Sequence, residues 1–412
     1  MTPAANILPR ALSPVVERAL AVTPVVVITG ARQTGKSTLV QTAPFLEGCP
    51  YFTLDRLDIL EQASRTPDDL ARRESRMIID EVQRAPDLLR AIKRVVDENR
   101  PRIAGQFVLT GSANLLLMKR VSESLAGRAT YLKLGPFTRR ERSGSGSVGD
   151  WTAFFDSEAE HWRELLLARD AAPEEWHDLA RVGGYPTPAR ELANDADRHI
   201  WFDGYIRTYL ERDLQALSAI DNLVDFRRVM VAACLRLGNL VNQTELGRDA
   251  GLPQPTVHRY LNLLETSCQL VRLPAFSVNR TKRLIKSPKA YWSDTGLALD
   301  LAGSVMPAGV HLENMVLTEL LAWRELEVIR SEIFYWRTAS GQEVDFVIER
   351  GDQLLPVEVK TTAQPRLRDA EHLRTFLDEY PEQTKGALLL HTGDETFWIR
   401  DSVLAVPWWR VF

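Results

Sequence analysis

Cysteine is scarce in this chain of 412 residues, and its apolar runs are short. The three cysteines, Cys49, Cys234 and Cys268, have neither Cys-X-X-Cys spacing nor histidine partners, which argues against a disulfide framework and a zinc site. No apolar run reaches the roughly 18 residues of a membrane helix, and the first residues lack a basic-then-apolar signal pattern. The sequence therefore predicts a cytoplasmic protein with no membrane partner.

A strong net charge is also missing. The formal net charge is −4 at pH 7, so bulk electrostatics does not attract nucleic acid, and any such contact would depend on local basic patches. A chain of this length with 45% hydrophobic residues predicts two or three globular cores. The one low-complexity stretch, residues 143–149, predicts a flexible surface loop or a junction.

A glycine-rich turn follows the apolar run of residues 25–28 and precedes a predicted helix. It is a complete P-loop, whose glycines let backbone N–H groups point at nucleotide phosphates. Lys36 would contact the β- and γ-phosphates of ATP as a catalytic residue, and the Ser37 hydroxyl would ligate Mg²⁺. The alternative is a plain glycine turn, in which these residue types coincide by accident. The predicted nucleotide-binding residues are Gly30, Ala31, Arg32, Gln33, Thr34, Gly35, Lys36, Ser37 and Thr38.

Two carboxylates end the next predicted strand, residues 77–79. They would project from the carboxyl end of the strand toward the phosphate site of an open α/β sheet. Asp80 would hold Mg²⁺ through water, and Glu81 would be the catalytic residue that orients or deprotonates the attacking water. The alternative is a solvated strand end.

Two further positions bear on this ATP site. The strand predicted at residues 107–112 ends in Thr110 and Ser112, either of which suits a sensor of the γ-phosphate or of water. Arg128 precedes the strand at residues 131–134. It is either an arginine finger or a plain surface arginine.

The alternation of strands and helical stretches through residue 142 predicts an α/β core with a parallel sheet and crossover helices, the ATPase domain of residues 1–142. A helical lid or linker region is predicted at residues 151–222. Within it, Arg207 or Arg212 would report on bound nucleotide, unless the helix that carries them serves only for core packing.

Residues 223–290 follow the order helix, helix, turn, helix and strand, which is typical of a winged helix-turn-helix. Gly251 is expected at the turn, and Thr244 at a helix cap. The alternative is a trihelical packing module that touches no DNA. The basic stretch of residues 279–289 is the local candidate for phosphate contacts, although a solvated hairpin explains it as well. The residues that the second helix would present to DNA are Gln254, Thr256, His258 and Arg259.

Residues 291–412 predict a separate α/β unit with strands at residues 332–338, 343–349 and 354–360. The hairpin of the last two strands would bring Asp345 beside Glu358 and Lys360, which share one face of their strand. Mg²⁺ held by the two carboxylates would polarise a phosphodiester, and Lys360 would position or activate the nucleophile. This is the catalytic arrangement of PD-(D/E)XK nucleases, with Glu313 on the preceding helix as a further metal ligand. The alternative is an exposed hairpin face that is lined by alternating Glu and Lys.

The chain resembles a large bacterial and archaeal family of AAA+-type P-loop ATPases that carry a winged-helix region and a C-terminal domain of unknown function. The resemblance implies an ATPase whose C-terminal domain is similar to restriction-type nucleases. It also implies a ring-shaped homo-oligomer in which a neighbouring subunit supplies an arginine, for which Arg128 is the candidate. The segments that carry the resemblance are residues 30–38, 78–83, 109–112, 125–128, 208–213, 291–297, 312–314, 343–346 and 358–360.

The leading functional hypothesis is an ATP-hydrolysing protein that acts on DNA, with ATP and Mg²⁺ as cofactors and a nuclease-like domain that cuts or grips nucleic acid. The rival hypothesis is a regulatory ATPase whose C-terminal domains mediate protein interactions without cleavage. Metal-dependent cleavage that is lost in an Asp345→Asn variant would distinguish the two.

Overall fold

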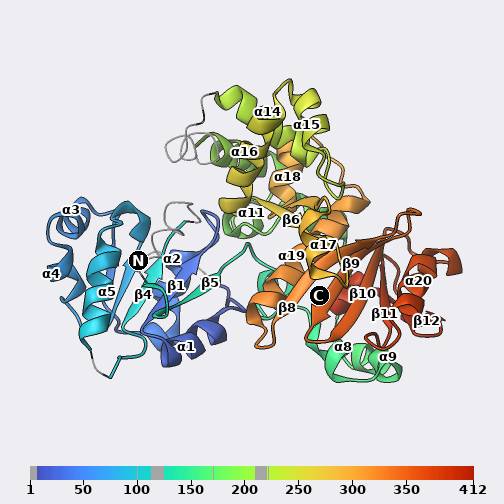
Figure 1. The fold of residues 1–412 in the computed structure, drawn as a ribbon, viewed down its shortest axis with the longest axis horizontal. Helices are drawn as coiled ribbons and strands as arrows, with labels where there is room; N and C mark the ends of the chain where they lie inside the picture. Colours follow the sequence, from blue (N-terminus) through green and yellow to red (C-terminus); the bar gives the residue numbers. More distant parts are fainter. Residues whose placement is uncertain (1–6, 100, 113–124, 170, 209–219, 221) are drawn as a thin grey trace.

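The computed structural model describes residues 7–99, 101–112, 125–169, 171–208, 220 and 222–412. It shows an α/β domain at the N-terminal end of the chain, a largely helical middle domain, and a C-terminal sheet domain, which meet at a common junction (Figure 1). Across these described ranges, no helix is long and apolar enough to cross a membrane.

The first domain is built on a five-stranded, all-parallel sheet in the order β2-β3-β4-β1-β5. Alternate residues of β1 face opposite sides, so Val25 and Val27 pack on α3, α4 and α5, while Val26 and Ile28 pack on α1 and α2. Because helices cover both faces, β1, β3 and β4 are apolar along almost their whole length. The predicted parallel sheet is confirmed. Its elements are α1 (Ser13–Val22), β1 (Val25–Thr29), α2 (Lys36–Thr42), β2 (Tyr51–Thr53), α3 (Leu57–Arg65), α4 (Pro67–Ala71), β3 (Met77–Asp80), α5 (Leu88–Glu98), β4 (Phe107–Thr110) and β5 (Ala129–Lys133).

The middle domain packs helices around Phe226 and Tyr260 and includes a two-stranded antiparallel ribbon, β6-β7. The expected order of three helices and a strand is present. Asn242, not Thr244, caps α15 through its side chain, and Gly251 ends that helix at φ +70°. The elements are α10 (Trp176–Val182), α11 (Pro186–Arg190), α12 (Asp195–Tyr205), α14 (Leu223–Cys234), α15 (Gln243–Ala250), α16 (Gln254–Thr266), β6 (Leu270–Leu273), α17 (Arg280–Ile285), β7 (Lys289–Trp292) and α18 (Thr295–Ala302).

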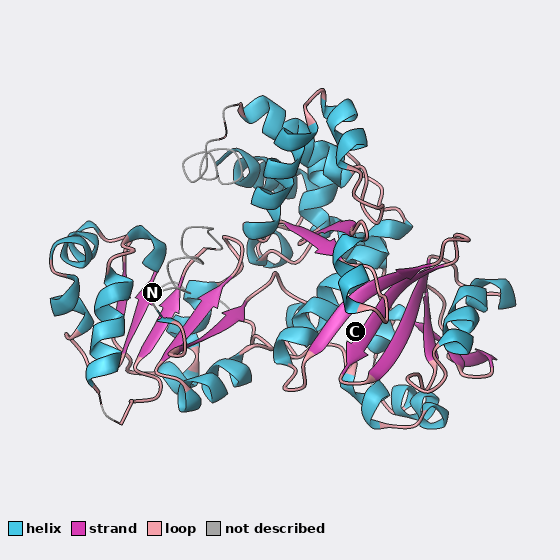
Figure 2. Ribbon diagram, in the orientation of Figure 1, coloured by secondary structure: helices cyan, strands magenta, loops and turns pink. Residues whose placement is uncertain are grey.

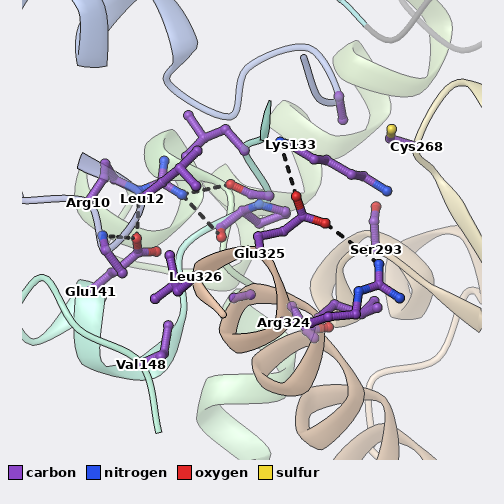
Figure 3. A pocket seen from close by; sticks show the side chains of 18 of the residues that line it. Arg10, Leu12, Lys133, Glu141, Val148, Cys268, Ser293, Arg324, Glu325 and Leu326 are labelled. Carbon is purple, nitrogen blue, oxygen red and sulfur yellow. Dashed lines mark hydrogen bonds and ion pairs between the residues drawn. The ribbon is translucent and has the colours of Figure 1, made fainter. Parts of the chain in front are cut away.

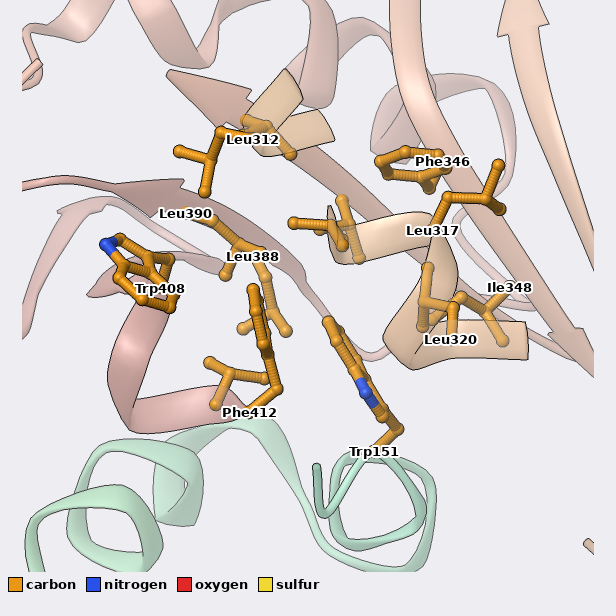
Figure 4. Close-up of a cluster of buried hydrophobic side chains, with 14 of the residues drawn as sticks. Trp151, Leu312, Leu317, Leu320, Phe346, Ile348, Leu388, Leu390, Trp408 and Phe412 are labelled. Atoms are coloured by element: carbon orange, nitrogen blue, oxygen red, sulfur yellow. The ribbon is translucent and has the colours of Figure 1, made fainter. Parts of the chain in front are cut away.

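The C-terminal domain has a mixed six-stranded sheet in the order β12-β13-β11-β10-β9-β8, with helices against it (Figure 2). The long helix α19 packs Leu312, Leu317 and Leu320 on the sheet (Figure 4). The elements are α19 (Gly309–Leu326), β8 (Ser331–Arg337), β9 (Glu343–Arg350), β10 (Gln353–Lys360), α20 (Glu371–Glu379), β11 (Ala387–His391), β12 (Phe397–Arg400), β13 (Val403–Pro407) and α21 (Trp408–Val411).

The packing differs from the expected segmentation at two places. Residues 151–166, expected in the helical linker, bury Trp151 and Trp162 in the C-terminal core through α8 (Thr152–Asp156) and α9 (Ala159–Leu167). Trp151 stacks on Phe412 with ring centroids 6.4 Å apart. Conversely, Trp292 and α18 pack in the middle domain, so the sheet domain begins at α19 rather than at residue 291. Large apolar side chains are buried against any apolar surface that the fold makes available. The local sequence does not reveal where in the fold that surface lies.

Candidate functional site

The P-loop connects β1 to α2 at the carboxyl edge of the parallel sheet, in the predicted context. At Gly30 an added Cβ atom would lie 2.2 Å from the carbonyl oxygen of Leu134, and Gly35 caps α2 with φ +87°. A side chain is excluded at the first position by the close approach and strained at the second by the backbone angle. Both glycines are therefore required for this turn.

Lys36 is buried, and its ammonium group donates hydrogen bonds to the carbonyl oxygens of Gly30 (3.2 Å) and Ala31 (2.6 Å). Burial lowers the pKa of Lys36 to about 8, although the nearby Glu81 and Asp80 carboxylates act in the opposite direction. The ammonium group thus sits at the base of the loop, where the phosphates of a nucleotide would be bound.

Asp80 is the centre of a hydrogen-bond network at the end of β3. Ser37 Oγ donates to its carboxylate at 3.0 Å, Tyr51 donates to Oδ2 at 2.6 Å, and Thr110 donates to Oδ1. A serine hydroxyl and a carboxylate are the oxygen ligands that hold Mg²⁺ in P-loop proteins, so the donor set fits the ion. Tyr51 gave no signal in the sequence, because it belongs to the short strand β2, whose neighbour in the sheet is β3.

Glu81 directly follows β3 and has a left-handed backbone, with φ 59°. Such strained positions cluster at active sites. Gln83 donates hydrogen bonds to Glu81 and to Ser112 Oγ (3.1 Å), and burial raises the pKa of Glu81. Of the two sensor candidates, Thr110 contacts Asp80, whereas Ser112 joins the Gln83–Glu81 pair. Gln83 was not singled out from the sequence.

The cleft beside the P-loop has a volume of about 420 Å³ and two walls from different domains. One wall is the P-loop with Asp55 and Glu81, and the other is α11 of the middle domain. Tyr205 on α12 also donates a hydrogen bond to the P-loop carbonyl of Arg32 at 3.4 Å. The lining residues are Arg32, Gln33, Gly35, Lys36, Ser37, Thr38, Asp55, Glu81, Pro186, Thr187 and Glu191.

Arg10, which the sequence did not indicate, contacts the P-loop and lies beside Glu141 in the pocket drawn in Figure 3. Its guanidinium donates to the carbonyl oxygens of Thr34 and Gly135, each at 2.7 Å, and pairs with Glu141 at 3.0 Å. Arg10 also lines a cavity of about 80 Å³ between the ATPase domain and α19. Because the guanidinium bonds to Thr34 of the P-loop and to Gly135 after β5, it links the loop to the neighbouring strand end and stabilises the conformation of the loop.

The arginines considered for nucleotide sensing lie elsewhere. Arg128 precedes β5 at the amino edge of the sheet, opposite the P-loop, and forms a two-contact ion pair with Asp97 at 2.6 and 2.8 Å. It therefore does not reach the ATP site of its own chain. Arg207 is exposed and pairs with Asp203, and Arg212 lies outside the described residues.

The C-terminal acidic cluster combines the predicted Asp345, Glu358 and Lys360 with an unpredicted Lys289. Lys360 pairs with Glu358 at 2.5 Å, and the amide N–H of Val359 donates to Asp345 Oδ2 at 2.9 Å. Lys289 pairs with Glu343, and its Nζ lies 3.7 Å from Asp345 Oδ1.

Glu313 also belongs to this cluster and accepts a hydrogen bond from Tyr291 at 3.2 Å. Burial, reinforced by the negative charge of Asp345, raises the pKa values of Glu313 and Glu358 to about 8. Across the described ranges, no group of three or more His, Cys, Asp and Glu side chains is arranged to hold a metal ion. In this structure the oxygens of Glu313, Asp345 and Glu358 are directed at lysines, a tyrosine and backbone N–H groups, and the metal site expected from these residues stays a prediction.

Several polar and basic side chains of the candidate DNA-binding surface are engaged by neighbouring residues of this chain. On α16, Gln254 donates to Gln243 at 2.8 Å, and His258 lies within hydrogen-bond distance of Gln243 and Asn262. In the basic stretch, Arg283 and Lys289 turn inward and pair with Glu349 and Glu343 of β9. Arg283 and Lys289 therefore fit neither the phosphate contacts nor the solvated hairpin expected of residues 279–289, because they anchor the segment to the C-terminal domain.

Comparison with known proteins agrees with this architecture. Residues 22–143 match the family model of an AAA domain, and residues 173–306 and 308–411 match two domains of unknown function, DUF8612 and DUF4143. Uncharacterized proteins of Mycobacterium tuberculosis and Mycobacterium bovis are each 30% identical over 401 residues, covering 95% of this chain and 81% of the relative. The chain belongs to the family of these mycobacterial proteins. Its first domain is a P-loop ATPase domain of the AAA type.

More distant similarities extend over much of this AAA-type ATPase. An uncharacterized protein of Haemophilus influenzae is 20% identical over 376 residues, or 86% of each chain. Among solved structures, a Walker-type ATPase of Pyrococcus abyssi is 17% identical and covers 72% of this chain and 99% of its own, with a TM-score of 0.43. The RuvB Holliday junction branch migration motor of Thermotoga maritima is 18% identical and covers 64% of this chain and 87% of its own, with a TM-score of 0.29.

Proposed function

We propose that this ATPase is a regulatory switch in which nucleotide turnover at the P-loop repositions the middle domain. The observation that carries the proposal is the two-domain cleft, whose wall opposite the P-loop is α11 with Pro186 and Thr187. A ligand that bridges two domains stabilises the arrangement in which both contact it, so binding and release shift their relative position.

The chemistry of turnover follows from the carboxylates at the end of β3. Asp80 and Ser37 would hold Mg²⁺, which supplies charge neutralisation for the phosphates. Glu81 orients and deprotonates the attacking water, and its raised pKa makes it a better proton acceptor than an ordinary glutamate. Gln83 fixes the Glu81 side chain and connects it to Ser112, which we assign as the sensor on that side of the site.

A hydrogen-bonded link leads from α11 to the rest of the molecule. The amide N–H of Gly184, just before α11, donates to Asp294 Oδ2 at 2.6 Å, while Asp294 Oδ1 accepts from Leu297 and caps α18. An added Cβ at Gly183 would lie 2.4 Å from Asp294 Oδ1. Movement of α11 is therefore transmitted to α18, which packs against α14 and α19.

Hydrogen exchange of a Glu81→Gln variant, which should retain bound ATP, tests the switch. We expect ATP to slow exchange in the P-loop, α11 and α18 together. An additional Asp294→Asn change keeps one oxygen to cap α18 but replaces the acceptor for Gly184, and it should confine the effect to the P-loop and α11. Protection limited to the P-loop in the parent variant would contradict the switch.

Action on DNA with cleavage at the C-terminal site is the second candidate function. It is favoured by the proximity of Asp345, Glu358 and Lys360 on β9 and β10. The decisive assay is Mg²⁺- or Mn²⁺-dependent cleavage of single- and double-stranded DNA, with and without ATP, by wild type and by Asp345→Asn. Cleavage that is lost in the variant supports this candidate, whereas no cleavage by either protein supports the regulatory switch.

The proposed ATPase function includes assembly of several subunits into a ring. Arg128 would then serve the ATP site of a neighbouring subunit and would have to leave its ion pair with Asp97. Sedimentation of wild type and Arg128→Ala with and without ATP, together with the hydrolysis rate, tests it. Nucleotide-dependent oligomers that hydrolyse ATP normally in the variant would exclude Arg128 as the finger.

A further inference from the structure

Lys289 belongs to the ribbon of the middle domain, yet its side chain lies in the carboxylate cluster of the C-terminal domain. It begins β7, pairs with Leu273 across the ribbon, and has a side chain that is only 4% exposed. Its ammonium group lies 5.7 Å from the ring centroid of Tyr335 on β8. The ribbon thus delivers a buried positive charge to a neighbouring domain.

The carboxylates around Lys289 are already directed at partners of this chain. Glu343 pairs with Lys289, and Asp345 lies between Lys289 on one oxygen and the amide N–H of Val359 on the other. Glu358 is occupied by Lys360 and by the amide N–H of Asp345 (3.3 Å). A divalent ion needs several free oxygens that converge on one point, whereas each of these carboxylates already contacts a lysine or a backbone N–H group of this chain.

A buried carboxylate is costly unless a cation compensates it. Lys289 meets that requirement for Glu343 and Asp345, as a metal ion would do in the PD-(D/E)XK arrangement. An ammonium group so close to Asp345 also repels a divalent cation, since like charges at this separation strongly oppose each other in a buried site.

A second connection reaches the same sheet from the same segment. Arg283 on α17 pairs with Glu349 of β9 at 2.7 and 2.9 Å. The backbone of residues 274–276 bonds to Tyr335 on β8 at 2.6 and 3.0 Å. Lys289 is therefore one of several fixed contacts between the ribbon region and the edge of the C-terminal sheet.

We propose that Lys289 is the resident cation of the C-terminal carboxylate cluster in place of a divalent metal, and that the cluster locks the ribbon of the middle domain to the C-terminal sheet. The resemblance to metal-dependent nucleases thus extends to the carboxylates and Lys360 but not to the metal. This assignment does not require the ATPase switch, and it opposes the cleavage candidate, which needs a divalent metal at these carboxylates.

Mn²⁺ binding to the nucleotide-free full chain, followed by the paramagnetic resonance of the free ion, tests the absence of a metal. We expect wild type and Asp345→Asn to bind Mn²⁺ equally, because the cluster contributes no site. Stoichiometric binding by wild type that Asp345→Asn abolishes would overturn the proposal.

Thermal unfolding tests the lock itself. Lys289→Met keeps the apolar stem but removes the charge, and it should lower the midpoint for the C-terminal domain by about 5 °C or more. The matched control is Lys286→Met, on the exposed side of the same segment, which should change the midpoint by less than about 1 °C. Equal midpoints for the two variants would overturn the proposal. If Lys289→Met fails to fold while Lys286→Met folds, this result supports the requirement for a buried positive charge at Lys289. The Mn²⁺ measurement then decides whether a metal ion also binds the carboxylates.

Discussion

At Lys36 the balance between burial and neighbouring charge sets how the protein responds to pH. Removal from water favours the neutral amine, while Glu81 and Asp80 favour the ammonium form, and the resulting pKa of about 8 lies close to neutrality. A bound triphosphate is a further group of negative charges, so the ammonium form is the one that binds ATP.

We therefore predict that ATP affinity falls as pH rises above about 8. The free protein loses the Lys36 proton in that range and must regain it to bind, so Kd should be level below pH 8 and approach a tenfold increase per pH unit above it. Calorimetric titration across pH 6.5–9.5 measures this. Lys36→Arg, whose guanidinium stays charged, should bind more weakly but with a flat profile, and a wild-type profile as flat as that would contradict the pKa assignment.

A second prediction concerns Arg10. Arg10→Lys keeps a positive charge near Glu141 but cannot hold Thr34 and Gly135 simultaneously, because an ammonium group lacks the planar fork of donors. We expect the KM for ATP to rise about tenfold, which corresponds to about 1.4 kcal/mol, with little change in kcat. Arg18→Lys, on an exposed part of α1, is the control. Unchanged KM in Arg10→Lys would show that the P-loop does not depend on this contact.

At the scale of elements, local sequence patterns located several strands and the hairpin of β9 and β10, but not the packing partners of distant elements. The apolar run before Gly30 and the Asp80–Glu81 strand end fixed β1 and β3 by local pattern alone. Trp151 and Arg10 contact Phe412 and Glu141, which lie more than 100 positions away in the chain. A local sequence pattern does not predict such contacts.

The N-terminal cap of α15 shows that local sequence can leave a cap undecided even within a single helical turn. Both Asn242 and Thr244 are good N-cap residues, but Asn242 accepts hydrogen bonds from the amides of Thr244 and Glu245. We predict that Asn242→Ala lowers the free energy of unfolding by about 1 kcal/mol, whereas Thr244→Ala, inside the helix, changes it by less than about 0.5 kcal/mol. Urea unfolding compares them, and the reverse order would place the cap at Thr244.

At the scale of the whole molecule, the sequence predicted four successive segments, residues 1–142, 151–222, 223–290 and 291–412, but not how they meet. It placed the P-loop, and yet one wall of the cleft comes from α11, which is separated from the loop by about 150 residues of sequence. It placed Asp345, Glu358 and Lys360 together, and missed Lys289, whose β-ribbon position has no motif. Long-range packing decides both features, and it depends on the complete fold rather than on any short pattern.

The most direct test of the account is Mg²⁺-dependent ATP hydrolysis by wild type and Glu81→Gln, with ATP binding measured on the same samples. Glutamine retains the size of Glu81 but cannot accept the proton of the attacking water, so we predict ATP binding within about twofold of wild type and a hydrolysis rate at least about 100-fold lower. Glu17→Gln, on an exposed part of α1, should hydrolyse ATP normally. Hydrolysis by Glu81→Gln at the wild-type rate would contradict the assignment of this site as the catalytic centre that drives the switch.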